Sequence, residues 1–174
     1  MAHAVMNALE RLAERHAVVE IDLASNDEVI ALTDTIMFRE AAQFYGGYAR
    51  DPQSGLGDDV RARLEAGMRI TTAQYEDARQ RAEVLVRVLR TRVASVDAVV
   101  EPTVPICAPR IEEAPALGGR LVSHTRLANL TGLPAISLPV PTLGLPVGLQ
   151  LTGSDSRRLL ACAAAVEGLL ALAG

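Results

Sequence analysis

Few residues in this chain of 174 could carry acid–base or nucleophilic chemistry, and they are scattered. The histidines are His3, His16 and His124, and none has the spacing of a metal ligand relative to another histidine or to a cysteine. Ser123 directly precedes His124, but a nucleophile and its base are defined by geometry and not by adjacency in the sequence. No serine lies in a G-x-S-x-G turn. Spacing and chemistry alone therefore assemble no active site and predict no metal centre.

Lysine is absent from the sequence, and all 17 basic residues are arginine. A lysine that forms a Schiff base, a phosphate-loop lysine and a serine–lysine catalytic pair are therefore excluded within this chain. A function that requires a lysine ammonium group must take that group from another chain.

Composition limits the partners that the chain can have. The formal net charge is −4, aromatic residues make up 3% of the chain and there is no basic run, so we expect no nucleic-acid partner. Cys107 and Cys162 are too few for a disulfide framework, which predicts a reduced, intracellular pair. Residues 1–15 do not read as a signal peptide, and the longest apolar stretch, residues 159–166, is too short to span a bilayer. We therefore predict a cytoplasmic protein without a membrane partner or a cofactor.

Hydrophobic patterning predicts alternating helices and strands at the start of the chain. Residues 1–15 have helical periodicity, whereas residues 18–23 are rich in β-branched side chains and indicate a strand. His16 lies at this junction, where a positive φ is expected. A second helix is expected over residues 26–45, ended by Gly46 and the glycine that follows it.

The middle of the chain carries a well-defined helix start. A short helix is expected over residues 58–66, stopped by Gly67. Thr71 and Gln74 have the spacing of a capping box, in which two side chains satisfy backbone N–H groups at the first turn of a helix. Apolar residues at helical spacing extend the predicted helix to about residue 96.

The last third of the sequence changes to strands and turns. Residues 98–104 form a strand candidate, followed by a proline-dense stretch that is expected to be extended and turn-rich. Residues 134–140 and 147–152 predict two short strands joined as a hairpin. Residues 157–172 predict a buried final helix, capped by one of the polar residues 154–156. The pattern predicts an α/β fold with a mixed sheet layered with helices.

Several stretches resemble the C-terminal part of the amidase signature family. The most specific are residues 129–139 (NLTGLPAISLP) and 144–153 (GLPVGLQLTG), in an order and at a spacing typical of that family. Residues 96–105 (VDAVVEPTVP) resemble its "DVLLTPTTP" strand, and residues 61–67 (RARLEAG) resemble its "VRARLEAG" helix end. Residues 11–22 are similar to the helix and strand that open the second half of these enzymes. The resemblance covers essentially the whole chain.

The resemblance implies a mixed sheet with helices on both faces and hydrolysis of a carboxylic amide to an acid and ammonia or an amine. It also implies a serine nucleophile, a bridging serine and a lysine base, all in the part of the family that precedes residue 1 here. Residues 1–174 are accordingly expected to be one domain, the C-terminal portion of the amidase fold. With no lysine and no Gly/Ser-rich segment, no catalytic residue can be carried over, and the chain is expected to be inactive alone.

Three residues in the matching stretches are expected near a substrate. They are Thr103 in the first strand motif and Asn129 and Thr131 in the hallmark stretch. The alternative for the latter two is a structural role, because Asn and Thr side chains can satisfy backbone groups in a turn.

Three functional hypotheses follow. The first is the C-terminal part of an amidase, which would take a small amide substrate once it is completed by an N-terminal half. The second is a non-catalytic interaction subunit that complements a separately encoded N-terminal half. Either one predicts an exposed sheet edge that favours self-association or a partner chain. The third, and the least favoured, is an independent enzyme with a site around His124.

Overall fold

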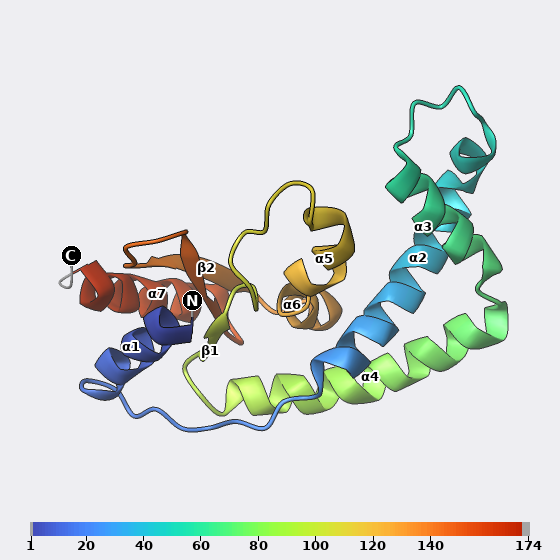
Figure 1. The fold of residues 1–174 in the computed structure, drawn as a ribbon. Helices are drawn as coiled ribbons and strands as arrows, with labels where there is room; N and C mark the ends of the chain where they lie inside the picture. The colour runs from blue at the N-terminus through green and yellow to red at the C-terminus, as the bar shows by residue number, and fades with distance from the viewer. Residues whose placement is uncertain (1, 172–174) are drawn as a thin grey trace.

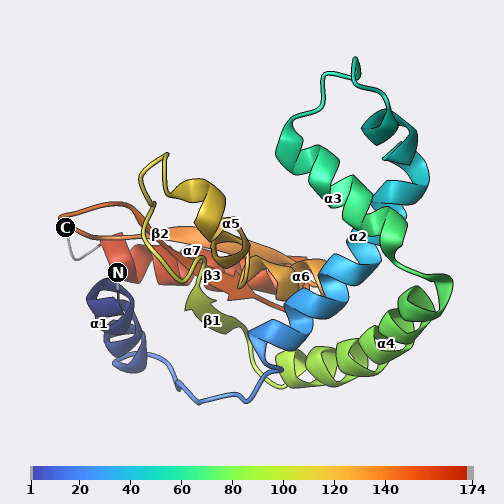
Figure 2. The same ribbon diagram turned by 45° about the vertical axis from the view of Figure 1, so that its right-hand side comes forward.

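The computed structural model describes residues 2–171, which form seven helices and three strands. In chain order the elements are α1 (Ala2–Ala13), α2 (Asn26–Arg50), α3 (Asp58–Arg69), α4 (Thr72–Ala94), β1 (Val99–Pro102), α5 (Ala114–Leu121), α6 (Thr125–Thr131), β2 (Ala135–Val140), β3 (Val147–Thr152) and α7 (Ser156–Ala171). The sheet with α1 and α7 lies at one end of the molecule, and an arm of α2, α3 and α4 lies at the other (Figures 1 and 2). Helices α5 and α6 lie between them. The α/β class predicted from the sequence is confirmed, although the described sheet is antiparallel and not mixed.

The sheet has the strand order β1-β3-β2, and both described pairs are antiparallel. The β2–β3 hairpin is confirmed, with Ala135 opposite Thr152 and Val140 opposite Val147. One face of the sheet packs on α1 and α7 and forms the main hydrophobic core. Leu149 and Leu151 of the central strand are fully buried there. Because side chains alternate along a strand, the other face presents a different set of residues.

Helix α7 is capped, as expected, by one of the polar residues at its N-terminus. Asp155 caps it, because its Oδ1 accepts hydrogen bonds from the backbone N–H groups of Arg157 (3.0 Å) and Arg158 (2.9 Å). Residues 1 and 172, the outer ends of the predicted first and last helices, lie outside the described residues. No helix within residues 2–171 is long and apolar enough to cross a membrane.

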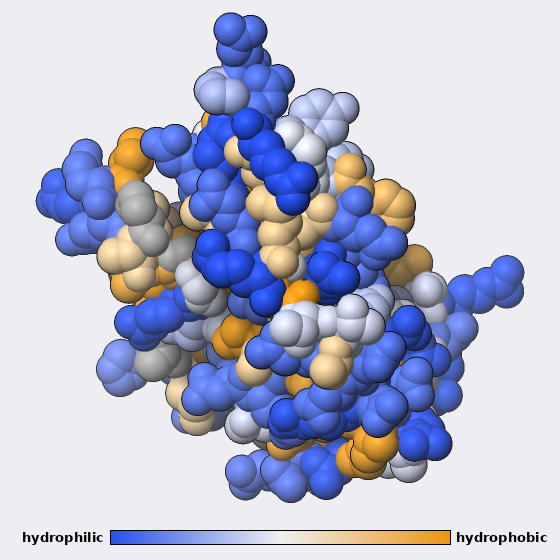
Figure 3. All heavy atoms as spheres, turned by 90° about the vertical axis from the view of Figure 1, so that its right-hand side faces the viewer, coloured by the Kyte–Doolittle hydropathy of each residue, from blue (hydrophilic) through white to orange (hydrophobic). Residues whose placement is uncertain are grey.

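The capping box at the start of α4 is confirmed. The Thr71 hydroxyl accepts a hydrogen bond from Gln74 N (3.2 Å), and Gln74 Oε1 accepts one from Thr71 N (2.9 Å). The buried face of α4 includes Ala78, Ala82 and Leu89, and the helix packs on α2 and α6. The surface of the arm in Figure 3 is mostly hydrophilic, with scattered hydrophobic patches.

The predicted helix ends at glycines are wrong. Gly46 and Gly47 lie inside α2, which continues to Arg50, and Gly67 lies inside α3, which continues to Arg69. The reason is tertiary packing. Gly46 is buried against Met68, and Gly67 lies against the backbone of α2. The absence of a side chain at these positions allows the two helices to approach closely, and neither glycine ends its helix.

The predicted strand over residues 18–23 is also wrong. The segment is extended, but none of the described strands pairs with it, and Val18 and Val19 are 53% and 63% exposed. It runs as a thin blue trace along the lower edge of the molecule (Figures 1 and 2). His16 has no positive φ, since among the described residues only glycines do. The proline-dense stretch, expected to be extended, leads into helix α5, which the pattern did not predict, and α6 follows.

Candidate functional site

The face of the sheet opposite the one that packs on α1 and α7 gathers several polar side chains, which form the candidate site. Glu101 of β1 lies opposite Gln150 of β3, which lies opposite Ser137 of β2. Residues directly opposite one another share a face, so these three form one row across the sheet. In the next row, Thr103 follows β1 and donates its backbone N–H to Gly148 O (2.9 Å). The register therefore brings side chains from three separate stretches of sequence together.

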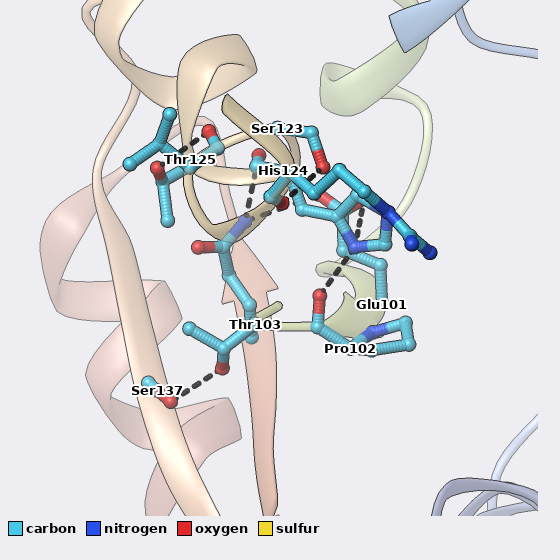
Figure 4. Close-up of polar contacts among 10 residues, drawn as sticks. Glu101, Pro102, Thr103, Ser123, His124, Thr125 and Ser137 are labelled. Atoms are coloured by element: carbon cyan, nitrogen blue, oxygen red, sulfur yellow. Dashed lines mark hydrogen bonds and ion pairs between the residues drawn. The ribbon is translucent and has the colours of Figure 1, made fainter. Parts of the chain in front are cut away.

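Two hydroxyl groups meet above Gly148. Thr103 Oγ1 and Ser137 Oγ are 2.5 Å apart, in a hydrogen bond that either can donate (Figure 4). A Cβ at position 148 would lie 2.6 Å from each of these oxygens. Glycine is thus what lets the hydroxyls of the two outer strands approach each other across the central strand. The pair is exposed and offers polar atoms on the open face.

His124, the residue before α6, is held over the end of β1. Its Nδ1 lies 2.7 Å from Pro102 O (Figure 4). A carbonyl oxygen only accepts, so Nδ1 carries a hydrogen and Nε2 is the free acceptor of the neutral ring. Gln150 Nε2 donates to Glu101 Oε1 (3.1 Å) and to His124 O (3.4 Å). The Glu101–His124–Gln150 cluster thereby joins β1, β3 and the start of α6.

The electrostatics of the cluster centre on the Glu101 carboxyl. Burial raises the pKa of Glu101 above its ordinary value of 4.5, and this outweighs the opposing effects of the His124 charge and the Gln150 hydrogen bond. Glu101 Oε2 lies 4.0 Å from His124 Nδ1, and the two side chains are 20% and 15% exposed. The carboxyl and the ring are therefore close enough to interact electrostatically in a partly desolvated setting, although they are too far apart for a direct hydrogen bond.

The structure does not bring the three expected substrate-facing residues together through direct hydrogen bonds. Thr103 lies on the polar face, bonded to Ser137. Thr131 is 2% exposed and donates its hydroxyl to Leu127 O (2.7 Å), which holds the last turn of α6 in place. Asn129 is exposed on the same helix.

Ser123, the residue next to His124 in the sequence, hydrogen-bonds to the backbone and not to the histidine. Ser123 Oγ donates to Arg120 O (3.0 Å) and not to His124, which agrees with the argument that adjacency does not make a catalytic pair. Sequence reasoning missed Glu101, Gln150 and Ser137 as site residues. The available signal was strand alternation, which places Glu101 and Thr103 on one face, but the pairing register had to be known to add the other two. Among residues 2–171, no three His, Cys, Asp or Glu side chains converge in a way that could hold a metal ion.

A family model described as Amidase matches residues 1–157. The chain belongs to the amidase family. A Pseudomonas putida protein named amidase is 29% identical over 146 residues, which cover 78% of this chain and 31% of that protein. A glutamyl-tRNA(Gln) amidotransferase subunit of Granulibacter bethesdensis is 36% identical over 133 residues, covering 69% of this chain and 26% of that protein. The family resemblance seen in the sequence motifs is confirmed.

Solved structures place the fold in the same family. A crystal structure of an amidase has a TM-score of 0.86 at 27% identity, and the match covers 97% of this chain and 42% of that one. A Kluyveromyces lactis allophanate hydrolase has a TM-score of 0.81 at 20% identity, covering 99% of this chain and 30% of that one, and shows the shared fold. The chain thus spans less than half the length of these relatives.

Proposed function

We propose that residues 1–174 are the C-terminal scaffold of an amidase that hydrolyses a carboxylic amide to the acid and ammonia or an amine. The nucleophile and the base would come from a segment outside these residues. The proposal rests on one observation: this chain matches the amidase family over most of its length, yet it contains no lysine. The serine–lysine chemistry that the family resemblance implies cannot be completed without a lysine.

In this proposal the polar face of the sheet forms one wall of the amide-binding cleft. Thr103 is the residue proposed to face the substrate, because its hydroxyl lies on the open face and is close to only one described partner. Asn129 is proposed as a second, peripheral contact on α6. Thr131 would act indirectly by holding the end of that helix, since its hydroxyl is already bonded to Leu127 O.

The completing segment is proposed to dock along the extended segment 17–25. This stretch carries exposed Val18 and Val19 and has no described strand beside it. An extended backbone that pairs with no strand accepts an additional strand readily, although Asp22 O already accepts a hydrogen bond from the Arg92 side chain. The completing segment could belong to the same polypeptide or to a separate one, and the two cases share this docking surface.

The chain by itself should not hydrolyse benzamide. Ammonia release by the purified chain is expected to equal that of buffer, because neither the nucleophile nor the base is present. Ammonium chloride added to the purified chain serves as a control that the assay detects ammonia. Turnover above that of buffer that His124→Ala abolishes would contradict the proposal and assign an independent site around His124.

Expression with the preceding coding region distinguishes the two ways of completing the enzyme. If that region continues in frame and encodes a lysine and a Gly/Ser-rich segment, the joined polypeptide should hydrolyse simple amides, and changing that lysine should abolish turnover. If the same features lie in a neighbouring gene, activity should require co-expression of both products. Absence of amide hydrolysis in both arrangements would overturn the proposal.

Self-association should reveal the docking surface. Size-exclusion chromatography of the concentrated chain is expected to show species larger than a monomer, because the extended segment exposes Val18 and Val19. Val19→Lys should shift the distribution toward monomer. Val84→Lys on α4, where the valine is 55% exposed, is the matched control and should not. A monomer at all concentrations would argue against an exposed docking surface.

A further inference from the structure

The Glu101–His124–Gln150 cluster departs from the family motif at one position. In the stretch that resembles "DVLLTPTTP", Glu101 stands where the motif has a threonine. A carboxylate at a partly buried strand position is costly unless neighbours hydrogen-bond to it or neutralise it. This chain supplies both kinds of neighbour, since Gln150 donates to Oε1 and the His124 ring lies 4.0 Å from Oε2.

The cluster also connects the residue that precedes α6 to two strands of the sheet. His124 Nδ1 donates to Pro102 O at the end of β1, and Gln150 bridges Glu101 and His124 O from the central strand. Helix α6 follows His124 directly and has no side-chain hydrogen bond at its cap. The position of the first turn of α6 therefore depends on contacts that include a titrating carboxyl group.

We propose that the Glu101–His124–Gln150 cluster is a pH-sensitive clasp that holds α6 against β1 more firmly at acidic pH than at alkaline pH. The inference stands apart from the amide chemistry proposed above, because it concerns how this chain holds its own α6 in place.

The direction follows from the groups around the carboxyl. Burial raises the pKa of Glu101, so its contribution to stability is fully present below 4.5 and is lost as pH rises through the value in the folded chain. His124 is the charged group that acts on Glu101 among the described residues; Gln150 from β3 and Ser137 from β2 are uncharged. As pH rises and Glu101 ionises, a partly buried carboxylate carries the cost of its lost hydration, and the clasp weakens.

Native-state hydrogen exchange of the chain tests the clasp. Protection factors, which divide out the intrinsic pH dependence of exchange, are measured for Leu130, Thr131 and Gly132 from below pH 4.5 to alkaline pH. They should fall as pH rises, by up to about tenfold per pH unit while one proton is released. Amides in α7, on the other face of the sheet, should fall less.

Glu101→Gln isolates the carboxyl from the rest of the fold. The glutamine keeps an oxygen that can accept from Gln150 but cannot ionise, so the α6 protection factors should become nearly independent of pH and exceed those of the unchanged chain at alkaline pH. Glu76→Gln, at an exposed position on α4, makes the same chemical change and should leave the pH dependence intact. A pH-independent α6 in the unchanged chain, or an unaltered slope in Glu101→Gln, would overturn the proposal.

Discussion

Gly67→Ala should destabilise the chain by about 3 kcal/mol, although alanine is the better helix former. A Cβ at this position of α3 would lie 1.9 Å from Phe38 O and 2.6 Å from Phe38 C, both backbone atoms of α2. It would also lie 2.9 Å from the Ala42 side chain. Backbone atoms cannot rotate out of the way, so α3 has to move off α2 and lose its close packing. Urea unfolding followed by far-ultraviolet circular dichroism measures the loss.

Gly47→Ala is the matched control for this prediction. Gly47 lies in the neighbouring helix, and a Cβ there would meet no atom within 4 Å. The substitution should therefore stabilise the chain by up to about 1 kcal/mol, because only the helix propensity changes. An unfolding midpoint for Gly67→Ala equal to that of the unchanged chain would mean that the two helices are farther apart than the structure places them.

These glycines show where sequence reasoning reaches its limit in the fold. A glycine after an apolar helical pattern is a common helix end, and the pattern at Gly46 and Gly67 is of that kind. Both instead allow two helices to approach, which depends on residues more than twenty positions away, such as Phe38 for Gly67. By contrast, the Thr71–Gln74 capping box is predictable because both partners lie within one turn.

The extended segment shows the same limit for strands. β-branched residues at 18–23 indicate a strand, but a strand exists only when a partner supplies the other half of its hydrogen bonds. The hairpin of β2 and β3 is predictable because each strand is the other's neighbour in sequence. Residues 18–23 need a partner that none of the described strands provides.

The candidate site is predictable in part for a similar reason. Thr103 lies on the polar face, in a motif that the family resemblance singles out. Glu101 and Gln150 are ordinary polar residues in strand patterns until the register places them opposite each other. Ser137 becomes a partner of Thr103 only because Gly148 lies between them and has no side chain.

Arg126→Met should cost about 3 kcal/mol and loosen the attachment of α6 to the helical arm. Arg126 Nη2 on α6 lies 2.8 Å from Asp34 Oδ1 on α2, and the side chains are only 14% and 31% exposed. Removing the guanidinium leaves the Asp34 carboxylate partly desolvated without its cation. The cost is at the lower end of that for a fully buried pair, because water still reaches Asp34. Urea unfolding gives the free energy.

A double-mutant cycle separates the ion pair from the packing of the arginine stem. Arg126→Met combined with Asp34→Asn should cost less than the sum of the two single changes, by about 1–2 kcal/mol, because the second change removes the stranded charge. Arg63→Met breaks an exposed pair with Asp59, whose side chains are 61% and 69% exposed, and should cost less than about 1 kcal/mol. Additive costs in the cycle, or equal costs at positions 63 and 126, would show that the Arg126–Asp34 contact does not join α6 to the arm. A confirmed coupling would mean that a change in the arm can reach His124, since α6 begins at the next residue.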